Sequence, residues 1–369
     1  MKLNKFAKTM VIAAMSGTIF LSSCDKTDKQ KDMSFPEMET AVINDFVDVV
    51  AHPLYSKFEI LAQNLKVAVQ ELSDNPTASN LDNARQAWKD VRVLWEQSEG
   101  FLIGPVDYLN YDPYLDTWPT DYQAMEALLS SNTPITVEYL TGLDDPENAT
   151  ELTLRGFHPL EYMLWGLGGN RDATTFTARE KEYMIALATD IHNNVKALKE
   201  SWLPGTINFG EVMKNPSVTN EHFHSKKEAL EAIANALITI CDEVGADKMS
   251  VPYDPVPDST LSESPYSHNS LADFKNNIIG ARNVYLSSFE GKTGKSLSVL
   301  IKENNRSLDN EIKAKFDVAI NSFDGFSTTF EDAIYNQRNQ VQTTLDALAS
   351  LQSTIGTKVI PYIQQYVKD

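Results

Sequence analysis

The feature that most constrains the fold is a helical spacing of apolar residues that continues through a long segment without proline. No proline occurs between Pro265 and Pro361. In this segment and in the one before it, apolar residues recur at every third or fourth position, the period of a helix with one buried face. Two such series are Leu230, Ile233, Leu237, Cys241 and Val244 within 225–247, and Leu271, Phe274, Ile278, Tyr285 and Phe289 within 269–290. The pattern predicts long helices, with turns at Gly291, Gly294, Gly325 and Gly356.

The chain as a whole favours an all-α fold, because it contains no convincing series of alternating polar and apolar residues. Its strongest linker signals are the segments 203–220 and 252–265, which are rich in proline and polar residues. We therefore expect two helical bundles, an N-terminal one over 35–205 and a C-terminal one over 206–369.

The N-terminus has the layout of an export signal. Met1–Lys8 holds three lysines, and Met10–Leu21 is apolar but too short to span a bilayer. The next residues, Leu21-Ser22-Ser23-Cys24, resemble the lipobox of bacterial lipoproteins. That resemblance implies a signal peptide over 1–23, lipid on Cys24, a flexible tether over 24–34 and stable attachment to a periplasmic or outer-membrane face. An ordinary signal with a chance cysteine is the alternative.

Charge and cysteine content limit the remaining functions. The 51 acidic residues exceed the 32 basic ones, for a net charge of −19. Such a surface repels nucleic acid and attracts cations, although a surplus of acids also serves solubility alone. Cys241 is the one cysteine besides Cys24, so an intramolecular disulfide framework is excluded and Cys241 is expected to be a small buried apolar residue.

A helix expected over 79–100 carries two charges on its apolar face. Arg92 and Glu99 share that face with Trp88 and Trp95. A buried charge without a partner is strongly destabilising, so each of the two needs a ligand or an ion pair across the bundle. The spacing of these residues does not decide between a ligand and an ion pair across the bundle.

The connection Phe101–Pro119 is long, and it is rich in acids and aromatic residues. Asp107, Asp112 and Asp116 alternate there with tyrosines and Trp118. A connection of this length is usually functional or disordered, and its aromatic content argues against disorder. The acids either line a cavity or cap short turns.

The sharpest local signal is the segment Gly156–Gly166. Pro159 is tolerated only in a first helical turn, so a helix is expected to begin at about His158, with Glu161 near its third position. An imidazole and a carboxylate that meet there form part of a metal site, or else a helix cap. Arg282 is another charged residue on an apolar stripe, that of Leu271, Ile278 and Phe289.

Familiar catalytic motifs are absent from the sequence. It contains no HExxH, no GxSxG and no glycine-rich phosphate loop. Glu221 and His224 form one Glu-x-x-His pair, but a di-iron bundle needs two such pairs and further glutamates. We expect this pair to be solvated.

The ordered set of motifs resembles the imelysin-like family over roughly residues 40–365. The central motif is GxHxxE at Gly156, His158 and Glu161. The remaining matches are Trp88, Trp95, Ser98, Glu99, Gly104, Pro105, Asp116, Trp118 and Pro119 upstream, and Glu263–Ser267 and Leu271–Phe274 downstream. The resemblance implies two bundles of the four-helix type with a site in the cleft between them. It also implies a link to iron uptake, and it carries a peptidase label from an insulin-cleaving membrane protease.

Transferred residue by residue, the resemblance implies a metal site. His158 and Glu161 would be ligands, with Glu99 and Asp116 as acidic positions beside them. The supporting residues would be Gly156, Arg92, Trp118, Ser267, Asp273 and Arg282.

Three hypotheses follow for function. The first is a lipid-anchored protein that binds a metal ion or metal complex, with iron favoured and zinc possible, and that serves iron uptake with a transport partner protein. The second is a metallopeptidase that uses the same residues, with Glu99 or Asp116 as general base. The third is a structural site, or one for an organic ligand such as a siderophore or haem.

Overall fold

Helices make up nearly all of the secondary structure in residues 33–143 and 152–368, which the computed structural model describes. The prediction of an all-α fold is confirmed. The long helices are α1 (Phe35–Asp45), α2 (His52–Asp74), α3 (Ala78–Ser98), α10 (Ala178–Trp202), α12 (Lys226–Asp242), α14 (Ser270–Leu286), α16 (Arg306–Ser322) and α18 (Arg338–Thr354). The predicted signal, tether and lipidated Cys24 lie outside the described residues.

Shorter elements connect the long helices. The short α-helices are α4 (Pro105–Tyr108), α5 (Tyr111–Asp116), α6 (Tyr122–Ser130), α7 (Val137–Thr141), α9 (Phe157–Trp165), α11 (Phe209–Lys214), α13 (Ser250–Tyr253), α15 (Leu297–Asn304), α17 (Phe330–Asn336) and α19 (Ile360–Tyr366). The π-helical segments are Phe46–Ala51, Glu243–Met249 and Ile355–Val359, and the 3₁₀ turns are Glu99–Phe101, Ala173–Thr175, Ser259–Leu261 and Phe323–Gly325. Strands β1 (Ser288–Phe289) and β2 (Lys292–Thr293) form an antiparallel hairpin.

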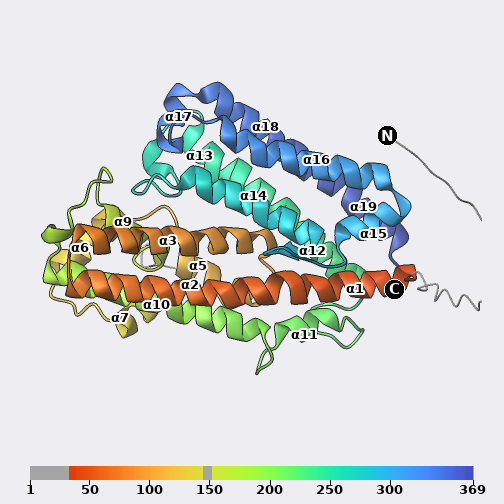
Figure 1. The fold of residues 1–369 in the computed structure, drawn as a ribbon, viewed down its shortest axis with the longest axis horizontal. Helices are drawn as coiled ribbons and strands as arrows, with labels where there is room; N and C mark the ends of the chain where they lie inside the picture. The colour runs from red at the N-terminus through yellow and green to blue at the C-terminus, as the bar shows by residue number, and fades with distance from the viewer. Residues whose placement is uncertain (1–32, 144–151, 369) are drawn as a thin grey trace, which may run out of the picture. The chain divides into compact units, whose positions relative to one another are not determined.

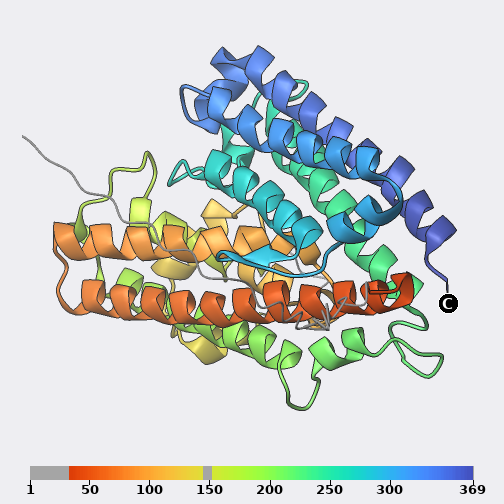
Figure 2. The same ribbon diagram turned by 45° about the vertical axis from the view of Figure 1, so that its right-hand side comes forward.

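Two groups of helices meet along α3 and α14. Helix α2 packs against α3 and α10 in the first group, and α12, α14, α16 and α18 pack together in the second (Figures 1 and 2). Helix α14 also packs against α3 and against the 3₁₀ turn Glu99–Phe101, which follows α3. The predicted boundary near residue 205 falls between α10 and α11, and it stays a prediction. None of the helices in the described ranges combines the length and the apolar character needed to cross a membrane.

Glycine allows α3 and α14 to approach closely. A Cβ atom on Gly280 would lie 2.2 Å from the carbonyl oxygen of Gln97, and one on Gly100 would lie 2.6 Å from the backbone nitrogen of Ala281. Backbone atoms cannot move aside as a flexible side chain can, so this crossing requires glycine on both sides. It brings charged residues of α3 next to α14.

The boundaries of the predicted helices are partly corrected. The helix expected over 269–290 ends at Leu286, because Ser287 and Glu290 adopt positive φ angles and the chain turns into the hairpin at Gly291. The helix expected over 225–247 continues past Asp242 as a π-helical segment and then α13. Gly356 does not mark a turn, because it lies in the π-helical segment that joins α18 to α19. The connection Phe101–Pro119 contains α4 and α5.

The close approach of α3 and α14 makes Gly280 sensitive to substitution. We expect Gly280→Ala to lower the free energy of unfolding by about 3 kcal/mol, because the added methyl group collides with backbone. Urea unfolding followed by circular dichroism measures the change. Gly356→Ala is the matched control, since its Cβ would lie 3.7 Å from Ile238, an ordinary contact. Equal stability of the two variants would contradict the packing described here.

Candidate functional site

Gly156 positions the start of α9 against the end of α5. Gly156 caps α9 with a φ of 89°, and a Cβ there would lie 2.2 Å from the carbonyl oxygen of Leu115. Only glycine fits such a position. Helix α9 begins at Phe157, so His158 is its second residue and not its cap, and Glu161 is its fifth residue and not its third. The glycine of the GxHxxE motif thus places His158 next to Asp116.

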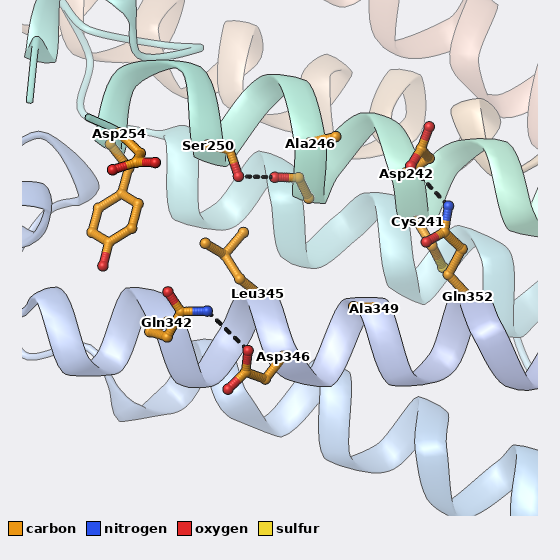
Figure 3. Close-up of a pocket in the computed structure, with 12 residues that line it drawn as sticks. Cys241, Asp242, Ala246, Ser250, Asp254, Gln342, Leu345, Asp346, Ala349 and Gln352 are labelled. Carbon is orange, nitrogen blue, oxygen red and sulfur yellow. Dashed lines mark hydrogen bonds between the residues drawn. The ribbon is translucent and has the colours of Figure 1, made fainter. Parts of the chain in front are cut away.

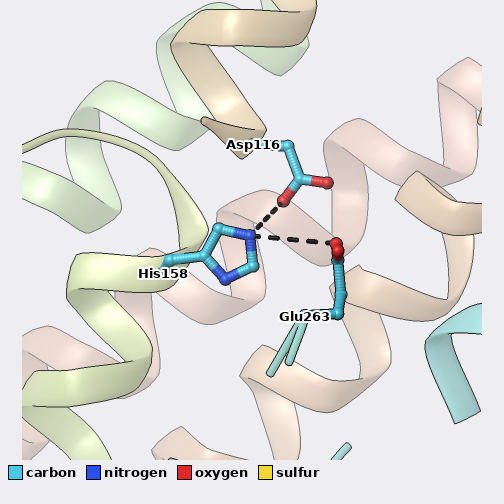
Figure 4. Close-up of side chains that lie close together, drawn as sticks. All are labelled: Asp116, His158 and Glu263. Carbon is cyan, nitrogen blue, oxygen red and sulfur yellow. Dashed lines mark ion pairs between the residues drawn. The ribbon is translucent and has the colours of Figure 1, made fainter. Parts of the chain in front are cut away.

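Three carboxylates surround the buried imidazole of His158. Its Nε2 atom lies 3.0 Å from Oδ1 of Asp116 and 3.9 Å from Oε1 of Glu263 (Figure 4). Its Nδ1 atom lies 3.7 Å from Oε2 of Glu161. His158 is 1% exposed, so these carboxylates are its immediate polar surroundings.

Glu161 is held by the chain on the other side of the site. Its Oε1 atom accepts hydrogen bonds from the backbone nitrogens of Tyr266 (3.1 Å) and Ser267 (2.7 Å), and from Oγ of Ser267 (2.6 Å). Its Oε2 atom is buried and accepts no hydrogen bond within the described part of the chain. Ser267 therefore holds one oxygen of Glu161, while the other oxygen lies 3.7 Å from Nδ1 of His158.

Arg92 joins the acids of four separate segments. Its buried guanidinium pairs with Glu96 on α3 and with Asp116 on α5. It also lies 3.0 Å from Glu263 and 3.6 Å from Asp273 on α14. The charge that α3 carries on its apolar face is thus explained by one ion pair within the helix, to Glu96, and by pairs with acids that the tertiary structure brings next to it.

A second buried cation of the cluster, Lys248, was not predicted from the sequence. Its Nζ atom lies 3.0 Å from Glu99, 3.4 Å from Glu263, 3.4 Å from Glu243 and 3.8 Å from Glu96. Lys248 could have been found by the same criterion as Arg92, because it is a charged residue on an otherwise apolar helical face. Lys248 is four residues after Val244, so it continues the series of α12.

Carboxylates outnumber the permanent cations of this cluster. The buried acids that contact Arg92, Lys248 or His158 are Glu96, Glu99, Asp116, Glu161, Glu263 and Asp273. Burial of unbalanced negative charge is strongly unfavourable, so the surplus must be met by protons or by a further cation.

Bound protons neutralise part of this surplus negative charge. Burial raises the pKa of Asp273 to about 8 and that of Asp112 to about 7, and it raises the pKa of Glu99 well above its usual value. Burial alone would lower the pKa of His158, but the charge and hydrogen bond of Asp116, together with Glu161, raise it to about 10. Burial also opposes ionisation of Asp116, yet Arg92 and His158 lower the pKa of that carboxyl below its usual range.

The same residues have the spacing of a metal site. Asp116, His158 and Glu263 each offer a ligand atom, and these atoms lie within 4.8 Å of one another. Glu96, Glu99 and Asp116 form a second such group. Ligands that bind one ion at 2.0–2.6 Å are about this far apart. The donor set, one imidazole nitrogen and several carboxylate oxygens, suits iron or manganese and is also accepted by zinc.

An acidic cavity of about 390 Å³ leads to this cluster. Its walls include Glu99, Asp112, Asp116, Trp118, Asp242, Glu243, Asp247, Lys248 and Glu263. Trp118, a predicted supporting residue, donates a hydrogen bond of 2.7 Å to the carbonyl oxygen of Ser262 and so fixes one wall. The negative lining favours the approach of a cation.

A separate cavity of about 430 Å³ lies between α12–α13 and α18 (Figure 3). Cys241 borders it together with polar residues such as Asp242 and Gln352, which are joined by a hydrogen bond of 2.8 Å. Cys241 is 2% exposed, as predicted, and burial raises its pKa to about 12. None of the predicted metal-site residues lines this cavity.

One predicted supporting residue lies away from the site. Arg282 was expected to support it, but its guanidinium is half-exposed and lies 3.4 Å from Asp317. The expectation was wrong because α14 turns this position outward, away from the stripe that contacts α3. Glu221 and His224 are exposed, as expected for a solvated pair.

The family model for imelysin (Peptidase_M75) matches residues 51–355. This chain belongs to the imelysin family. A relative named iron-regulated protein A, from Synechococcus elongatus, is 28% identical over 327 residues, which are 87% of this chain and 86% of the relative.

Solved structures agree with this assignment. A crystal structure from Parabacteroides distasonis, described as an iron-regulated protein A precursor, has a TM-score of 0.81 and 29% identity, and the match covers 89% of this chain and 95% of that one. An imelysin-like protein from Psychrobacter arcticum has a TM-score of 0.72 at 15% identity, over 92% of this chain and 99% of that one, which shows a shared fold. The resemblance seen in the motifs is confirmed.

Raised pKa values predict that the metal-free protein loses stability as pH rises. His158, Asp273 and Asp112 bind their protons more tightly in the folded protein than in the unfolded chain, so the stability that they contribute is lost as pH rises through their folded pKa values. Above pH 8, His158 is the main contributor of the three. We therefore expect the Tm of chelator-treated protein to fall between pH 8 and 9.5, and to fall less in His158→Gln. Calorimetry measures this, with His224→Gln as the exposed control; equal slopes in all three proteins would contradict the assignment.

Proposed function

We propose that this protein binds a metal cation, with iron favoured, at His158 and the carboxylates around it, and that it serves iron uptake. The observation that carries the proposal is the convergence of ligand atoms from Asp116, His158 and Glu263 within 4.8 Å, inside a buried cluster with surplus negative charge. Glu161 offers a further free carboxylate oxygen. A bound cation would neutralise the surplus negative charge of these carboxylates, so metal binding itself would compensate the buried charge.

Iron is favoured for two reasons. The ligand set is dominated by hard carboxylate oxygens, with a single imidazole nitrogen. The relative from Synechococcus elongatus bears the name iron-regulated protein A, which is consistent with a role in iron metabolism for the family. Glu263 joins the predicted ligands, whereas Glu99 is paired with Lys248 in the metal-free protein.

Loss of the imidazole tests the site directly. We expect wild-type protein to bind Fe²⁺ stoichiometrically in anaerobic calorimetry and His158→Ala to lose that binding, because the nitrogen ligand and its link to Asp116 are removed. His224→Ala should bind as wild type does. Circular dichroism checks that each variant is folded. Failure of the wild-type protein to bind Fe²⁺, Mn²⁺ or Zn²⁺ would reject the proposal.

A metallopeptidase is the alternative function for the same residues. A hydrolytic zinc site needs about three protein ligands, an open position for water and a general base. Glu99 and Asp116, the candidate bases, are engaged by Lys248 and by Arg92 and His158. Carboxylates engaged in this way are poorly placed to accept a proton from an attacking water molecule, which argues against hydrolysis. Chelator-sensitive cleavage of an unfolded substrate, lost in Glu99→Gln, would reverse this preference.

We further propose that the protein is exported and anchored by lipid on Cys24. The lipobox-like segment before Cys24 supports this. In a bacterial host that processes lipoproteins, wild-type protein should sediment with membranes, and Cys24→Ala should lose lipid labelling and appear in the soluble periplasmic fraction. Cys241→Ala is the matched control and should stay with the membranes. Equal fractionation of wild type and Cys24→Ala would contradict the anchor.

A further inference from the structure

The ammonium group of Lys248 lies among carboxylates that a bound metal would use. It is 3.0 Å and 3.3 Å from the two carboxylate oxygens of Glu99, and 3.4 Å from Oε1 of Glu263. Glu263 belongs to the group that converges on His158, and Glu99 belongs to the second group of candidate ligands. A metal ion and this ammonium therefore compete for the same oxygen atoms.

The side chain of Lys248 can move out of the carboxylate cluster more easily than that of Arg92. Arg92 is fully buried, and its guanidinium packs near the rings of Trp88 and Phe157 while it pairs with acids of several segments. Lys248 lines the acidic cavity and has a long flexible side chain on a π-helical segment. Asp242 and Asp247 line the same cavity and are exposed, so they offer the ammonium other acids further out.

We propose that Lys248 is a displaceable counter-cation of the metal site. Without metal, its ammonium pairs with the carboxylates of Glu99 and Glu263. When a metal ion binds these carboxylates, the ammonium moves away from them into the acidic cavity. This inference rests on the proposed binding of metal. It implies selection by charge, because a monovalent ion gains too little from the carboxylates to displace a group that is already singly charged, whereas a divalent or trivalent ion gains more.

The opposite role is that of a positioning residue. Lys248 would then stay in place and hold Glu99 and Glu263 in the geometry that the metal needs. The two roles predict opposite effects of removing the ammonium: tighter metal binding if it competes, and weaker binding if it positions.

Substitution of Lys248 separates the two roles. We expect Lys248→Met, which keeps the length of the side chain and removes its charge, to bind Mn²⁺ at least about tenfold more tightly than wild type in calorimetry. Lys214→Met is the matched control, because Lys214 pairs with Asp48 and Glu211 outside the cluster. It should leave the Kd within about twofold of wild type. Lys248→Arg keeps the charge and should not gain affinity.

A measurement on the wild-type protein keeps the inference testable if Lys248→Met folds poorly. The reactivity of Lys248 toward a water-soluble amine-acylating reagent is followed by peptide mass spectrometry. Lys248 is 6% exposed, so its labelling should be slow without metal and should rise severalfold with saturating Mn²⁺. Labelling of Lys214 serves as the internal reference and should not change.

The outcomes distinguish this inference from the function on which it rests. Equal or weaker Mn²⁺ binding by folded Lys248→Met, or unchanged labelling of Lys248 when Mn²⁺ is bound, overturns the displacement and leaves metal binding intact. Absence of Mn²⁺ and Fe²⁺ binding in both proteins overturns metal binding and the displacement together.

Discussion

The guanidinium of Arg92 connects acids from four parts of the chain, and the arrangement of the site depends on this interaction. Glu96 and Asp116 come from the first group of helices, while Glu263 and Asp273 come from the second. A charge buried this completely needs such partners, and each partner needs Arg92 in turn. The two groups of helices therefore cannot separate without exposing uncompensated charge. The close glycine crossing of α3 and α14 brings these partners within reach of one another.

This arrangement leaves the cluster short of positive charge. Arg92 and Lys248 balance only some of the acids, and protons held on His158 and Asp273 meet part of the rest. A metal cation can replace those protons, provided that it binds where ligand atoms already converge. The acidic cavity is lined by Asp116 and Glu263, two of the residues whose ligand atoms converge there. If the protein binds metal as proposed, the metal affinity, the stability of the protein and the pH are linked through the same few residues.

The backbone contributes to the site as much as the charged side chains do. Gly156 permits the contact with Leu115 that places His158 beside Asp116, and the amides of Tyr266 and Ser267 hold one oxygen of Glu161. The other oxygen of Glu161 points toward the imidazole. A ligand held in this way loses little freedom when it binds an ion, which favours affinity.

The sequence by itself determined the helical fold and the family, and it pointed to His158 and Glu161 as candidate site residues. Helical periodicity is a local property, and the GxHxxE segment brings His158 and Glu161 together within one helix. The family resemblance also implied Glu99 and Asp116 beside them, but only the tertiary structure added Glu263 and Lys248 to the cluster. Glu263 and Lys248 reach the site through the packing of α3 against α14, and Arg282 points away from it, because the direction of a side chain on a helix depends on what the helix packs against. Charge balance in a buried cluster is a property of all the segments that meet there, so no single stretch of sequence contains it.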